Sequence, residues 1–192
     1  MSSNHHLFHA AKELVETLNK AVDDNLPAEI AEIVKTHSAG AAAASVAAGW
    51  IPGAGGLAAA GICAGFIWTM YGRINSKIGL PITENIVKSL ATGVATNLAS
   101  GLVGALVVQT VISLFPGIGS FAAAAIAGTT GYALTLASGY VYLKLLTKLF
   151  LAGKDPTKMD ESSLKEEASR VAATENMKDV ISSAKAEFKS SK

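Results

Sequence analysis

Three histidines near the N-terminus, His5, His6 and His9, form the pattern in this sequence that most resembles a metal site. Residues three or four positions apart share one face of a helix, and imidazole is a common zinc ligand. Helix ends near a chain terminus are frayed, however, and histidines there are usually just hydrated. We therefore expect no metal site.

The apolar part of the chain offers equally little for catalysis. It contains neither a pair of carboxylates nor a Ser-His-Asp set, and Glu84 with Lys88 at i+4 is most simply a surface ion pair. Asn97 and Gln109 are expected to join neighbouring helices by hydrogen bonds, with the lining of an aqueous path as the alternative. We expect neither an enzyme nor a cofactor.

A proline–glycine pattern occurs twice, in Ile51–Cys63 and Phe115–Ala127, at the same interval throughout. Proline stops a helix and glycine accepts positive φ, so the pattern predicts a tight reversal between two helices. The repeat predicts an all-α fold of two tandem apolar helical hairpins. The predicted turn residues are Pro52, Gly53, Gly55, Pro116, Gly117 and Gly119.

Charge is distributed very unevenly along the 192 residues, of which 50% are hydrophobic and 16% charged. No Asp, Glu, Lys or Arg occurs from Thr36 to Gly72 or from Ser89 to Leu143. Helices on the surface of a soluble protein need a polar face, so these runs predict a membrane-embedded domain. The net charge of +1 gives no basic field for nucleic acid. Cys63 is the single cysteine, so no intrachain disulfide can form.

Three segments follow from this distribution: an N-terminal arm at 1–35, the membrane-embedded double hairpin at 36–153, and a polar, charged tail at 154–192. Apolar residues at helical spacing predict an amphipathic helix over 6–22. In the tail, Ser163 and Glu166 form a capping-box pattern that predicts a helix start. The N-terminus lacks the pattern of a cleaved signal peptide.

Within the hairpins we expect helices from Pro27 to the first turn and over 57–78, 82–114 and 119–150. Only about 20 Å of uncharged helix precedes the first turn, short of a hydrocarbon core of about 30 Å, so the first hairpin is expected to dip in. Small residues at four-residue spacing predict close helix packing and a homo-oligomer. They are Thr92, Thr96, Ser100 and Gly104, with Gly128 in the last helix.

Aromatic residues near the ends of the uncharged runs are typical of membrane–water interfaces. The expected interface anchors are Trp50, Trp68, Tyr71, Tyr140 and Tyr142. Basic residues follow them, and the connection between the hairpins is basic, so we expect both termini on the cytoplasmic side of a bacterial inner membrane.

Several of these pieces together resemble the YcjF-type membrane domain, an uncharacterised bacterial family found mainly C-terminal to small GTPase domains. The resemblance covers about residues 38–150. It is carried by Ile51-Pro-Gly, Met70-Tyr-Gly, Leu80-Pro, Phe115-Pro-Gly-Ile-Gly-Ser and the Thr-Gly-Tyr at 130–132. Since the chain has no phosphate-binding loop, the resemblance implies a GTPase partner acting in trans.

Two function classes fit these features. The first is a non-enzymatic, membrane-embedded, self-associating module that shapes or scaffolds the membrane. The second is an oligomeric channel or pore in which the small-residue rows pack several copies around a conduit. A third class is a soluble all-α oligomer that hides its apolar rows between subunits.

Overall fold

A computed structural model describes residues 3–18, 25–49, 55–100, 118–174 and 177–190. These residues form seven α-helices and one 3₁₀ helix and contain no strand, which confirms the all-α prediction. The α-helices are α1 (Ser3–Thr17), α2 (Leu26–Gly49), α3 (Gly55–Ile78), α4 (Glu84–Ser100), α6 (Ile118–Leu151), α7 (Glu161–Thr174) and α8 (Met177–Ser190); η1 is Pro156–Lys158.

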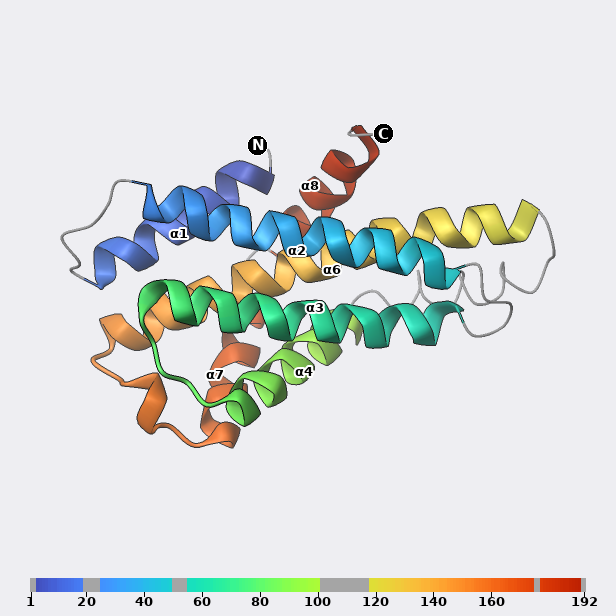
Figure 1. Cartoon of the computed structure of the whole chain (residues 1–192). Coiled ribbons are helices and arrows are strands. Elements are labelled where there is room, and N and C mark those ends of the chain that lie inside the picture. The colour runs from blue at the N-terminus through green and yellow to red at the C-terminus, as the bar shows by residue number, and fades with distance from the viewer. Residues whose placement is uncertain (1–2, 19–24, 50–54, 101–117, 175–176, 191–192) are drawn as a thin grey trace.

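The long helix α6 is the centre of the fold. It packs against each of the other six α-helices that the structure describes, and Figure 1 shows it running between α2 and α3. Almost every side chain from Ala127 to Val141 is buried. A helix that is apolar all round has to be covered on every side in water, which explains why α6 occupies the axis.

Glycines in α6 let α2 come close. A Cβ at Gly139 would lie 2.6 Å from Val34 Cγ1, and one at Gly131 would lie 2.5 Å from Ser45 Oγ. At Gly128 the added atom would meet Val46 Cγ2 at 2.5 Å. Each glycine therefore keeps open a position that a larger residue would block.

Helices α2 and α3 run antiparallel. Gly40 faces Phe66 near the middle of the pair, and Lys77 Nζ lies 2.7 Å from Glu29 Oε2 at its far end. Their connection, with Pro52 and Gly53, lies outside the described residues, while Gly55 begins α3. The second turn, with Pro116 and Gly117, is also outside them, and Gly119 lies in the first turn of α6.

Two helices end with a glycine in the left-handed conformation. Gly79 has φ of 69° after α3, and Gly153 has φ of 67° after α6. In both places the next residue's N–H donates back into the last turn, from Leu80 to Asn75 O and from Lys154 to Leu149 O. This satisfies carbonyls that a helix end otherwise leaves free, so these stops are encoded locally.

The arm and the tail pack against the central helices and share their core. On α1, Leu7, Ala11 and Leu14 are fully buried, and the helix lies on α2 and α6. In the tail, Leu164 of α7 and Ala184 of α8 belong to the same hydrophobic cluster. The apolar faces of the arm and the tail are thus covered by the rest of the chain.

Helix α7 begins earlier than the capping-box pattern predicts. Its first residue is Glu161, and Asp160 Oδ1 accepts a 2.9 Å hydrogen bond from Ser163 N. A carboxylate at the N-cap satisfies free N–H groups and also favours the positive end of the helix dipole. Asp160 therefore takes the capping position that the sequence analysis gave to Ser163.

We predict opposite effects for the same substitution at two glycines. Gly139→Ala should lower the free energy of unfolding by about 1–3 kcal/mol, because Val34 is fully buried and has no space to withdraw. Gly65→Ala should raise it by about 0.5–1 kcal/mol, since no atom lies within 4 Å of the added Cβ. Thermal unfolding followed by circular dichroism measures both. A Gly139→Ala protein that is as stable as the wild type would contradict the close α2–α6 packing.

Candidate membrane-contacting end of the bundle

The uncharged runs of α2 and α3 end at the same height in the bundle. Lys35 is the last charged residue of α2, and Arg73 is the first of α3. Both lie between the Gly40–Phe66 contact and the Glu29–Lys77 ion pair, and so near one level of the antiparallel pair.

In two further helices, α4 and α6, the uncharged run also ends close to this level. Lys88, the last charged residue of α4, places its Nζ 4.2 Å from the ring centroid of Trp68 in α3. Gly139 of α6 lies against Val34 and Met70, and Lys144 follows about one and a half turns later. We call Lys35, Arg73, Lys88 and Lys144 the basic collar.

On one side of the basic collar the bundle is built from uncharged helix. The C-terminal half of α2 and the N-terminal parts of α3 and α6 meet there, at the right-hand end of Figure 1. Ala48, Ile62 and Ala127, one from each helix, pack together in a small separate cluster. We call this part of the protein the uncharged end.

Helix α8 covers one side of the uncharged end. Tyr132 of α6 donates to Glu187 Oε1 at 3.3 Å, and its ring lies 5.4 Å from that of Phe188. Phe188 Cζ also lies 3.4 Å from the place of a Cβ on Gly128. Helix α8 thus brings charged residues alongside an otherwise uncharged part of α6.

The expected interface anchors occupy quite different positions. Tyr71 and Tyr142 are 0% exposed, and their rings stack with centroids 3.9 Å apart. Tyr140 is also buried, Trp68 is partly buried, and Trp50 lies outside the described residues. Tyr71, Tyr140 and Tyr142 are therefore not interface anchors in this fold, because their side chains are buried in contacts between helices.

The two buried tyrosines also make polar contacts. Tyr71 donates to the carbonyl oxygen of Ser138 at 3.0 Å, and Tyr142 donates to Asn75 Oδ1 at 2.5 Å. Asn75 Nδ2 is buried and has no hydrogen-bond partner among the described residues. Its amide is therefore held by a single contact in the core, which makes that contact valuable for stability.

Small-residue positions are distributed over several faces. Thr92, Thr96 and Ser100 belong to α4 and Gly104 lies beyond the described residues, whereas Gly128 packs on α2 and α8 of the same chain. A face of α3 on which small residues are exposed was not among the predicted packing positions. Gly61, Gly65, Thr69 and Gly72 lie on it, and the four-residue spacing of the first three was the available signal.

Among the described residues, one helix segment, Ala124–Leu151, is long and apolar enough to cross a membrane. The central helices of many water-soluble proteins have the same length and composition. As 78% of its most apolar window is buried inside the bundle, this segment does not by itself place the chain in a membrane.

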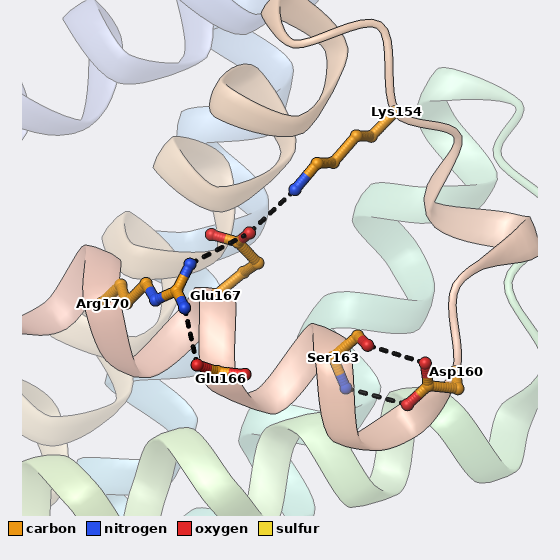
Figure 2. A network of polar contacts seen from close by, with 6 residues as sticks. All are labelled: Lys154, Asp160, Ser163, Glu166, Glu167 and Arg170. Atoms are coloured by element: carbon orange, nitrogen blue, oxygen red, sulfur yellow. Dashed lines mark hydrogen bonds and ion pairs between the residues drawn. The ribbon is translucent and has the colours of Figure 1, made fainter.

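The opposite end of the protein is polar. Figure 2 shows Glu167 of α7 accepting from Lys154 at 2.9 Å, while Arg170 pairs with Glu166 at 2.6 Å. The Lys154 hydrogen bond holds the pKa of Glu167 below its usual value. Hydroxyl and N–H donors from Ser162 and Ser163 lower the pKa of Asp160 further still. This end carries the charges of a water-facing surface.

No family model, curated protein or solved structure matches the chain. The YcjF-type resemblance therefore stays a prediction. In the described part of the chain, no three His, Cys, Asp or Glu side chains are placed to share a metal ion. His5 and His9 lie with ring centroids 6.5 Å apart on α1.

We predict that Tyr142→Phe destabilises the protein by about 1–3 kcal/mol, because it leaves the buried Asn75 amide with no partner. Adding Asn75→Leu should recover much of that loss, since both polar groups are then gone. Chemical denaturation of the two single variants and the double variant gives the coupling free energy between the side chains of Tyr142 and Asn75. Strictly additive losses would show that the Tyr142–Asn75 hydrogen bond is not formed.

A second prediction concerns pH and α7. The pKa of Asp160 is lower in the folded than in the unfolded protein, so its ionised form stabilises the fold above the unfolded pKa. That contribution falls as the pH drops toward the folded pKa. Amide exchange protection in α7 should therefore weaken between about pH 5 and pH 2 in the wild type. Asp160→Asn should reduce this pH dependence and leave the part that comes from Glu167; an unchanged profile in the variant would contradict the cap.

Proposed function

We propose that the protein is a non-enzymatic membrane module that inserts its uncharged end into a bilayer as far as the basic collar. The observation that carries the proposal is that four helices change from uncharged to basic within a band about two turns deep. Lys35, Arg73, Lys88 and Lys144 are far apart in the sequence, and only the fold brings them into this band. Basic residues at such a boundary suit the phosphate groups of lipids.

The dimensions of the uncharged end are compatible with insertion. From Ile118 to Gly139, α6 rises by about 32 Å, close to the roughly 30 Å of a hydrocarbon core. From Lys35 to Gly49, α2 rises by only about 21 Å. The end would therefore displace more lipid in the near leaflet than in the far one, which favours a role in shaping or scaffolding the membrane.

Helix α8 limits how deep that side of the bundle can go. Glu187 lies beside Tyr132, about two turns into the uncharged end from Gly139. Charged side chains at that depth are costly in hydrocarbon. Insertion to the collar therefore requires α8 to separate from α6, after which its apolar face can lie at the headgroups.

Self-association and a GTPase acting in trans belong to the same proposal. Self-association is supported by the four-residue spacing of Thr92, Thr96 and Ser100 in α4, because a row of small residues would let a second helix approach closely. The GTPase is supported by the family resemblance alone, and the polar end is the part left in water to meet it.

We predict that a single acidic residue on the uncharged end weakens vesicle binding. Ala47→Glu and Ala125→Glu place the charge at exposed positions of α2 and α6, so the fold in water should be unaffected. Each should lower binding by roughly a hundredfold, since an acidic residue at mid-membrane costs about 3 kcal/mol. Ala173→Glu, exposed on α7 at the polar end, is the matched control and should bind as the wild type. Flotation with liposomes measures all four proteins.

The same vesicles separate the other function classes. Narrowed or tubulated vesicles that retain their contents support the module. Vesicles of unchanged shape that release a trapped dye would replace it with the channel. A wild-type protein that stays in the aqueous phase would overturn both and leave the soluble oligomer.

A further inference from the structure

We propose that the exposed face of α3 binds an anionic phospholipid, such as phosphatidylglycerol. This inference rests on the proposed insertion and names the lipid that the basic collar would select. The inference is based on two neighbouring grooves on this face, one polar and one apolar.

The polar groove lies at the level of the collar. It has a volume of about 520 Å³ and is lined by Arg73 and Ser76 of α3 and by His37 of α2, with Phe66, Trp68, Thr69 and Gly72. Arg73 is exposed, whereas the other basic residue of α3, Lys77, is paired with Glu29 at 2.7 Å. The guanidinium of Arg73 can bind two phosphate oxygens at once.

His37 of α2 closes one side of this groove. Its Nδ1 donates to the carbonyl oxygen of Ile33 at 2.7 Å, and only 7% of the residue is exposed. The positive charge of the groove is therefore supplied by Arg73, which favours a lipid of net negative charge over zwitterionic phosphatidylcholine.

The apolar groove continues along α3 toward the uncharged end. Its volume is about 480 Å³, and it shares Phe66, Trp68 and Thr69 with the polar groove. Beyond them it is lined by Ala44, Gly61, Ile62 and Gly65, and a Cβ on either glycine would meet no atom within 4 Å. A lipid with its phosphate at Arg73 would lay the first part of an acyl chain over these glycines.

Trp68 supplies a local probe, because its indole lines both grooves. The test uses the full chain carrying Trp50→Phe, which leaves Trp68 as the single tryptophan. The protein is bound to phosphatidylcholine vesicles that contain a small, equal fraction of either phosphatidylglycerol or phosphatidylcholine with brominated acyl chains. Bromine quenches tryptophan fluorescence only at short range, so quenching reports which lipid lies in the groove.

We expect phosphatidylglycerol to quench Trp68 with an apparent affinity at least about fivefold above that of phosphatidylcholine, the factor that one basic residue contributes near a membrane surface. Arg73→Gln should remove this preference, and Gly65→Leu should reduce quenching by filling the apolar groove. The matched controls are Lys77→Gln, which removes a charge on the same helix, and Ala173→Leu, which places the same leucine side chain at an exposed position of α7 at the polar end. Both should behave as the wild type.

Each other outcome has a distinct meaning. Equal quenching by the two lipids on vesicle-bound protein would overturn the lipid site and leave the proposed insertion intact. Bound protein in which neither lipid quenches Trp68, and in which Gly65→Cys forms a disulfide between two copies, would assign the face to a second copy of the chain. Failure to bind vesicles at all would overturn both proposals.

Discussion

The close approach of α2 to α6 is the contact on which the rest of the structure depends. Gly128, Gly131 and Gly139 leave no side chain between the two helices, so Val34 and Ser45 occupy the space that a Cβ would need. This contact fixes the height of α2 against α6. Helix α3 is then held against α6 by the Tyr71–Tyr142 stack and the hydrogen bond from Tyr71 to Ser138 O. Changing one of these glycines would therefore shift several helices together.

The basic collar is a consequence of that fixed register. Lys35 and Arg73 are brought level by antiparallel pairing, and Lys88 joins them through its contact with Trp68. Lys144 lies about one and a half turns beyond Gly139, and its Nζ lies 2.6 Å from Glu13 Oε2 of α1. A slip of one turn between α2 and α6 would move Lys35 and Lys144 by about 5 Å relative to each other along the bundle. The proposed membrane role thus depends on packing in the interior as much as on the surface.

The covering helices α1, α7 and α8 give the protein two faces with different properties. Their apolar residues close the sides of α6, so most of the long hydrophobic helix is hidden within one chain. The face of α3 with Gly61, Gly65 and Gly72 is left open, and the grooves lie there. The chain thus covers α6 on one side and leaves a face of α3 exposed on the other. A protein that moves between water and a membrane needs both, because it must stay folded in water and still offer a surface to lipid.

Much of the local structure could be predicted from the sequence, because its signals are local. The periodicity over 119–150 gave α6 to within one residue at each end, and 57–78 gave α3 nearly as well. Gly79 and Gly153 end their helices through hydrogen bonds within a few residues. The uneven distribution of charge could also be read directly, because it depends only on the order of charged residues along the chain.

Only the tertiary structure decided what each helix face contacts. Tyr71 and Tyr142 are of the residue type that anchors helices at membrane interfaces. They nevertheless stack in the core, because α3 and α6 bring them together from 71 positions apart in the sequence. The amphipathic arm and tail gave no sign of which surface would cover their apolar sides. Nor did the sequence place Arg73 beside His37, or leave Gly61 and Gly65 open. Helical periodicity determines which residues share a face, but the partner of that face depends on packing between helices that are distant along the chain.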